Sequence, residues 1–186
     1  MTALRTIALV LVAAAMLGAE GAREIEPIRD FESDFDLSLK DWKEIEAMLP
    51  PYPRDENLLP FLAGGASVHR FFLDAKSLAI GKDGIVRYTL VVKTAGGATN
   101  VSFEGIRCEM RQQKYYALGH PGGNWTRARN PEWRRIVFRD ANGQHGVLFA
   151  DYLCAGAGST RFPVNSVAEV VQRLKYGPPA RATADD

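Results

Sequence analysis

The residues best suited to binding chemistry lie in one basic segment that also carries two tryptophans, residues 124–139 (NWTRARNPEWRRIVFR). A guanidinium group grips phosphates and carboxylates with parallel hydrogen bonds, and an indole ring can stack on a sugar or a base. The segment therefore suggests a contact surface for an anionic ligand. The candidate contact residues are Trp125, Arg127, Arg129, Trp133, Arg134 and Arg135.

A second interpretation of this segment stays open. Runs of charge are usually solvated faces. On that view the tryptophans fill the edge of the core, and the arginines stay hydrated or pair with acidic residues 24–36.

Hydrolytic chemistry would require two carboxylates, or a nucleophile and a base, brought together in space. None of the available groups falls within a G-x-S-x-G or H-E-x-x-H motif. The simpler expectation is that Glu104 pairs with Arg107 and that Asp151 is a buried carboxylate bonded to backbone or arginine. We assign no catalytic residue, and the sequence leans away from an enzyme. The available groups are Glu104, Glu109, Asp140, Asp151, His69, His120 and His145.

No cofactor or metal site is expected. The three histidines lie in separate sequence contexts, without the clustered spacing of metal ligands. The glycine-rich stretch AGAGST, residues 155–160, lacks the lysine of a phosphate-binding loop.

The sequence has two cysteines, Cys108 and Cys154, separated by 46 residues. In an oxidising compartment such a pair is usually joined, and closing a loop of that length stabilises a fold by roughly 4 kcal/mol. The alternatives are two buried thiols or one unpaired reactive cysteine. A C-x-x-C redox motif is absent, so we predict a structural disulfide.

The first residues, MTALRTIALVLVAAAMLGAEGA, have the layout of a secretory signal peptide. Arg5 precedes an apolar run, residues 7–17, which is shorter than the ~20 apolar residues that cross a bilayer. Ala19 and Gly21 are the small residues at the −3 and −1 positions, so we predict cleavage after Gly21. No cysteine lies near the cut to accept a lipid, and no second long apolar run predicts a transmembrane segment.

The rest of the chain divides by composition. We expect an acidic arm at 22–37, one domain at 38–176 and a disordered tail at 177–186, following the signal peptide at 1–21. About 165 residues are enough for one hydrophobic core. The formal net charge of +1 gives no overall field that would recruit nucleic acid.

Periodicity predicts an α+β fold with an antiparallel β-meander, covered by N-terminal and C-terminal helices and held by one disulfide. A capped apolar stripe predicts a helix at 38–49, and strict alternation predicts a strand at 85–93. The apolar parity changes within 101–110, so we expect a bulge near Gly105 that returns all of these residues to one face. Helices are expected at 146–154 and from Ser166 to 176.

The run VRYTLVVKTAGGATNVSFEGIRCEM, followed by KYYALG, Trp125 and DYLC, resembles the cryptic neisserial protein-like family of proteobacterial envelope proteins. EGIRC, residues 104–108, is the most specific part. The resemblance implies a periplasmic location and a family without an assigned activity. The basic segment and the lack of catalytic motifs favour a non-enzymatic envelope accessory or binding module that contacts an anionic envelope component or an acidic protein. A small secreted hydrolase of envelope polymers, built on Glu104, Asp151 and a histidine, is the alternative.

Overall fold

The structure is a computed structural model that describes residues 42–63, 67–137, 143–156 and 161–179. The predicted signal peptide, the acidic arm and the end of the tail lie outside these residues. The first elements are η1 (Asp55–Asn57), β1 (Leu58–Phe61), β2 (Arg70–Asp74), β3 (Ala79–Ile80), β4 (Ile85–Lys93), β5 (Thr99–Arg107) and β6 (Gln112–Gly119). They are followed by β7 (Trp125–Arg127), β8 (Arg134–Arg135), α2 (Gly143–Val147), a π-helix (Leu148–Leu153), β9 (Cys154–Ala155), β10 (Phe162–Pro163) and α3 (Val167–Tyr176).

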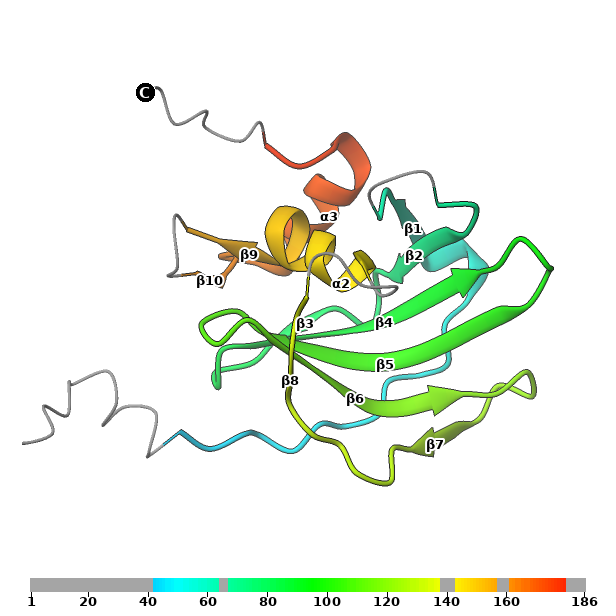
Figure 1. The fold of residues 1–186 in the computed structure, drawn as a ribbon, viewed down its shortest axis with the longest axis horizontal. Coiled ribbons are helices and arrows are strands. Elements are labelled where there is room, and N and C mark those ends of the chain that lie inside the picture. The colour runs from blue at the N-terminus through cyan, green and yellow to red at the C-terminus, as the bar shows by residue number, and fades with distance from the viewer. Residues whose placement is uncertain (1–41, 64–66, 138–142, 157–160, 180–186) are drawn as a thin grey trace, which may run out of the picture. The chain divides into compact units, whose positions relative to one another are not determined.

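The sheet is an antiparallel meander in the order β1-β2-β4-β5-β6-β7, with β3 added beside β4 and β8 beside β6 (Figure 1). Strand β4 occupies the predicted residues, and Gly84 supplies the positive φ of the turn before it. The predicted α+β class, the antiparallel sheet and the single disulfide are confirmed.

One face of the sheet carries the main core. Val86, Tyr88 and Leu90 of β4 pack there with residues of the π-helix and α3. Figure 1 shows α2 and α3 together on this side of the strands. Helix α3 begins as predicted, because the Ser166 side chain accepts a hydrogen bond from the Glu169 amide.

The opposite face of the sheet is also covered. A bulge does lie near Gly105, as predicted, but it does not return the apolar residues of β5 to one face. Pairing between β4 and β5 is regular along its length, so Phe103 and Ile106 point to opposite faces. The irregularity lies on β6, where Tyr116 is the extra residue opposite Phe103 and Glu104. Apolar groups of both parities occur in β5 because both of its faces are buried, and not because a bulge returns them to one face.

The predicted helix at 38–49 is wrong over the residues that the structure describes. Residues 42–53, which we call the strap, contain no helix or strand. The strap lies against the second face, where Ala47 packs in a small cluster with Phe103 and Tyr116. Its backbone is bonded to the sheet side: the Ile45 amide donates to Asp83 and the Ile45 carbonyl accepts from Arg87. These contacts replace the hydrogen bonds that a helix would make.

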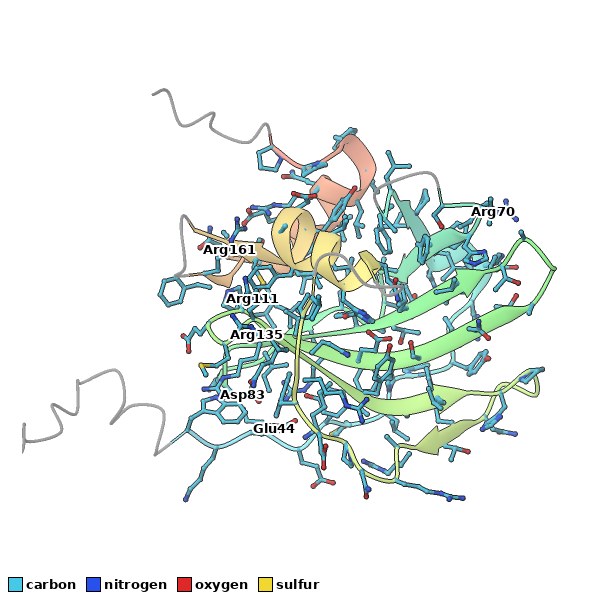
Figure 2. The ribbon with its side chains drawn as sticks, viewed as in Figure 1. Glu44, Arg70, Asp83, Arg111, Arg135 and Arg161 are labelled. Carbon is cyan, nitrogen blue, oxygen red and sulfur yellow. A yellow bond between two sulfur atoms is a disulfide. The ribbon has the colours of Figure 1, made fainter. Side chains whose placement is uncertain are left out.

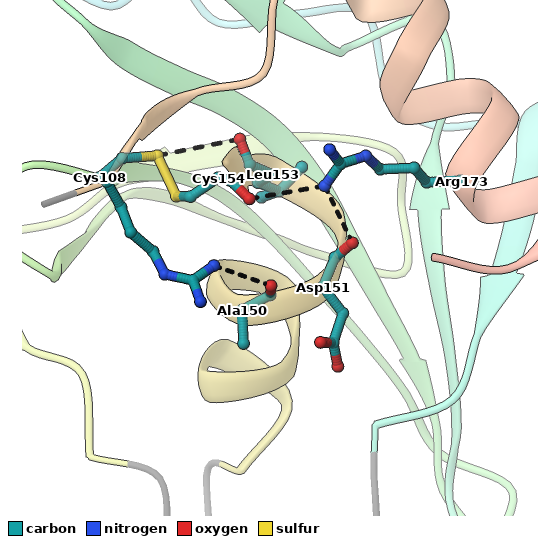
Figure 3. The surroundings of a disulfide bond; sticks show 7 residues. Cys108, Ala150, Asp151, Leu153, Cys154 and Arg173 are labelled. Atoms are coloured by element: carbon teal, nitrogen blue, oxygen red, sulfur yellow. Dashed lines mark hydrogen bonds between the residues drawn. A yellow bond between two sulfur atoms is a disulfide. The ribbon is translucent and has the colours of Figure 1, made fainter. Parts of the chain in front are cut away.

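The disulfide joins the end of β5 to the start of β9. Cys108 and Cys154 are both buried in the main core, with their Cα atoms 5.7 Å apart. Figure 3 shows Arg173 of α3 beside this bond, donating to the carbonyl oxygens of Asp151 and Cys154 at 3.1 and 3.5 Å. The bond therefore fixes the π-helix and α3 to the sheet.

Candidate functional site

The two tryptophans of the basic segment point into the molecule. The Trp133 indole donates to Glu44 at 3.0 Å and packs edge-on against Trp42, with ring centroids 6.3 Å apart. The Trp125 indole donates to the Pro50 carbonyl at 2.9 Å. Both rings hold the strap, so their placement corresponds to the core-filling interpretation for the tryptophans.

The arginines of the same segment are placed differently. Four of them are exposed on β7, β8 and the loop between these strands, and none of their side chains makes a hydrogen bond or ion pair with another described residue. In Figure 2, Arg135 lies close to Arg111, in agreement with the 2.9 Å hydrogen bond from the Ile136 amide to the Arg111 carbonyl. We call the four the arginine face: Arg127, Arg129, Arg134 and Arg135.

Glu44 is the centre of the contact between strap and sheet. Its carboxylate accepts from Lys114 and from the Tyr116 hydroxyl, each at 2.8 Å, as well as from Trp133. Burial alone would raise the pKa of Glu44, but these hydrogen bonds and the charge of Lys114 outweigh it and hold the pKa below its usual value. Burial, reinforced by the hydrogen bond to Glu44, raises the pKa of Tyr116 far above its ordinary value.

Two further cations lie beneath the strap. Arg87 forms a buried ion pair with Asp83 at 2.6 Å. Burial opposes ionisation of Asp83, but the hydrogen bond from Arg87 and the Ile45 amide lower its pKa overall. Arg107 lies over the Trp42 ring, 3.7 Å from its centroid, and burial lowers the pKa of its guanidinium. The second face of the sheet thus presents the cations Arg87, Arg107 and Lys114. The carboxylates come from Glu44 of the strap and from Asp83 of the turn before β4.

Two cavities border the strap. One, of about 300 Å³, is lined by Glu44, Glu46, Lys114 and Tyr116 together with Arg127 of the arginine face. The other, of about 520 Å³, lies on the far side of Tyr52 and includes Lys93 and Val101. Both volumes fall within the range of small-ligand pockets.

The groups considered for hydrolysis converge in part. Glu104 contacts His145 at 2.8 Å and accepts from Tyr88 at 3.0 Å and from Ser102. Ser102 bonds to the carboxylate oxygen that does not contact His145, so the serine–histidine–carboxylate order of a hydrolytic triad is not formed. Glu104 and His145 are both almost fully buried, and neither lines the two cavities described above.

Other predicted partners are not brought together. Arg107 points to the face opposite Glu104, so the expected Glu104–Arg107 pair is wrong. His69 accepts from the Ala95 amide, and His120 contacts Thr126. Asp140 lies outside the described residues. Among residues that the structure describes, no group of three or more acidic, histidine or cysteine residues could hold a metal.

Sequence reasoning missed the roles of Glu44, Asp83 and Tyr88. Glu44 falls within the segment predicted as a helix, 38–49, and Asp83 stands directly before the turn glycine Gly84. A local signal existed only for Glu104, a charged residue inside a strand whose neighbours are apolar.

Comparison with known proteins agrees with the family resemblance. A model of the CNP1-like family matches residues 38–175, and the chain belongs to this family, for which no function is established. No curated protein and no solved structure matches. Within the described part of the chain, no helix is long and apolar enough to cross a membrane.

Proposed function

We propose that this protein is exported to the periplasm and acts there as a non-enzymatic binding module for an anionic component of the cell envelope. The contact surface is the arginine face, with the 300 Å³ cavity beside Arg127 as its concave part. The proposal is supported chiefly by one observation: four exposed guanidinium groups have no partner among the described residues.

Free guanidinium groups favour anions for a physical reason. An exposed arginine that already pairs with a carboxylate must give up that pair before it binds a ligand, whereas these four need not. Each offers a planar fork of donors to a phosphate or a carboxylate. Because the tryptophans are engaged by the strap, binding at this face is electrostatic, without ring stacking, and weakens as salt rises.

Two further observations support export. The cysteine pair is joined in the structure, and disulfides persist in oxidising compartments such as the periplasm. The amino-terminal sequence has the features of a signal peptide.

The hydrolase alternative has weaker support. Glu104 and His145 do meet, but they are buried and engaged with Tyr88 and Ser102. Substituting Glu104 is therefore expected to reduce stability and to leave binding of anions by the folded protein unchanged.

The test compares binding to vesicles that contain an anionic phospholipid, to a soluble acidic polysaccharide and to neutral vesicles. Replacing all four arginines of the arginine face by alanine should abolish salt-sensitive binding to the anionic probes. A control variant removes the same number of exposed positive charges elsewhere: Lys43, Arg70, Lys82 and Lys175. Equal binding by the parent protein and the arginine variant would refute the assigned surface, and equal loss in both variants would show that only overall charge matters.

A further inference from the structure

The larger cavity, of about 520 Å³, is lined by no residue of the arginine face. It lies on the strap side of the sheet, where β4 ends and β5 begins. Its lining joins apolar and polar groups: Tyr52, Asp55, Val91, Lys93, Thr99 and Val101.

The floor of this cavity is apolar and rigid. Val91 and Val101 are buried cross-strand partners in the middle of the sheet. Tyr52 forms a wall, and its ring lies 5.4 Å from the Trp125 ring. Gly119 makes this position possible, because a Cβ atom there would lie 2.9 Å from the Tyr52 ring. The aromatic wall is therefore fixed in place before any ligand binds.

The polar groups of the cavity lie at the end of the hairpin. Lys93 is the cross-strand partner of Thr99, and its ammonium lies 3.0 Å from the Asp55 carboxylate. The Asp55 side chain is 84% exposed, so this ion pair contributes little and is easily exchanged. An ammonium also has three donors, of which Asp55 takes one. The Tyr52 hydroxyl makes no hydrogen bond to any residue that the structure describes.

We propose that this cavity binds one sugar ring that carries a carboxylate. The C–H face of the ring packs on the two valines and Tyr52, the ring hydroxyls bond to Thr99 and the Tyr52 hydroxyl, and the carboxylate reaches Lys93. A bare anion would leave the apolar floor unused, and a purely apolar ligand would bury the lysine and the hydroxyls without partners. None of these residues belongs to the arginine face, so the inference does not rest on the proposed function.

The test is a titration of the oxidised, isotopically labelled protein, followed by backbone amide NMR shifts. The ligands are methyl glucuronide, the neutral methyl glucoside and acetate. We expect shifts confined to the amides around the cavity, with the glucuronide bound about tenfold more tightly than the glucoside, as one charge-assisted hydrogen bond provides. Acetate at the same concentration should leave these amides unchanged.

Two variants assign the roles. Lys93→Met should bring the affinity ratio of the two sugars to about one, whereas the control Lys82→Met, in the turn before β4, should keep it near tenfold. Tyr52→Leu should weaken both sugars and keep their ratio. If Tyr52→Leu does not fold, the ratio of glucuronide affinity to glucoside affinity in folded Lys93→Met still tests the proposal. Absence of shifts, equal binding of the two sugars by the parent protein, a ratio unchanged by Lys93→Met, or shifts at the arginine face instead would overturn the proposal.

Discussion

At the residue scale, the described contacts beneath the strap are pairings of individual charges that local sequence does not reveal. Glu44 and Lys114 are 70 residues apart, and Glu44 and Trp133 are 89 apart. Pattern analysis identifies which residues are polar, but pairing over such distances depends on the order of strands in the sheet. Composition identifies the arginine-rich segment, but it does not identify Glu44 as the carboxylate that accepts a hydrogen bond from Trp133 of that segment.

Replacing Glu44 by glutamine should lower the free energy of unfolding at pH 7 by about 1–3 kcal/mol, since Lys114 loses its charged partner. The folded-state pKa of Glu44 lies below that of the unfolded chain. Its stabilisation is therefore complete above the unfolded pKa of about 4.3 and is lost as pH falls through the lower, folded pKa.

Urea unfolding between pH 3 and 7 measures this effect. The difference between parent and Glu44→Gln should shrink as the pH falls below about 4. Glu46→Gln is the matched control, because Glu46 lies exposed on the same strap and should change stability little. A difference that stays constant across this pH range would contradict the role given to the carboxylate.

Gly105 shows how a sequence signal can be correct while its explanation is wrong. The change of parity drew attention to this residue, but the structural reason is close packing by Tyr116. A Cβ atom at Gly105 would lie 2.9 Å from the Tyr116 ring and 3.0 Å from Ile85. We expect Gly105→Ala to lower the thermal midpoint and to cost about 1–3 kcal/mol, through overpacking. Gly96→Ala, where a Cβ meets open space, should have little effect in the same melting experiment.

At the scale of elements, sequence reasoning succeeded where periodicity is local and failed where tertiary contacts override propensity. The strand at 85–93 was found at its observed bounds, since alternation determined it directly. The strap has a helical apolar pattern, yet its backbone groups bond to Asp83 and Arg87. Helix propensity is worth a few tenths of a kcal/mol per residue, so several hydrogen bonds to buried charges outweigh it.

Asp83→Asn tests what holds the strap. The change leaves Arg87 without its buried charged partner and weakens the bond to the Ile45 amide. We expect a loss of about 3–5 kcal/mol in stability and faster hydrogen exchange in the strap than in β4. Asp55→Asn removes an exposed carboxylate and serves as the control. Unchanged exchange in the strap of the Asp83 variant would mean that other contacts hold it.

At the scale of the whole molecule, the disulfide supplies the longest covalent restraint that the sequence allowed us to predict. The spacing of the two cysteines gives the length of the closed loop. Only the structure shows which elements the bond links, namely the end of β5 and the start of β9. The meander was predictable because each strand pairs with a strand next to it in the sequence, apart from the short β8, which pairs with β6. The sequence did not predict how the second face of the sheet is covered, because the covering strap has no regular secondary structure.

Removing the disulfide should therefore affect both packed layers. Replacing Cys108 and Cys154 together by serine, or reducing them, opens a loop of 46 residues and should lower the free energy of unfolding by roughly 4 kcal/mol on the chain-entropy model. Urea unfolding with and without reductant measures the difference, and the double variant, which should not respond to reductant, is the control. Because the bond connects the π-helix to β5, hydrogen exchange should rise first in residues 143–156 and α3, and later in the centre of the sheet. A uniform rise throughout the described chain would show that the bond stabilises the fold only by restricting the unfolded state, and not by fixing the helices to the sheet.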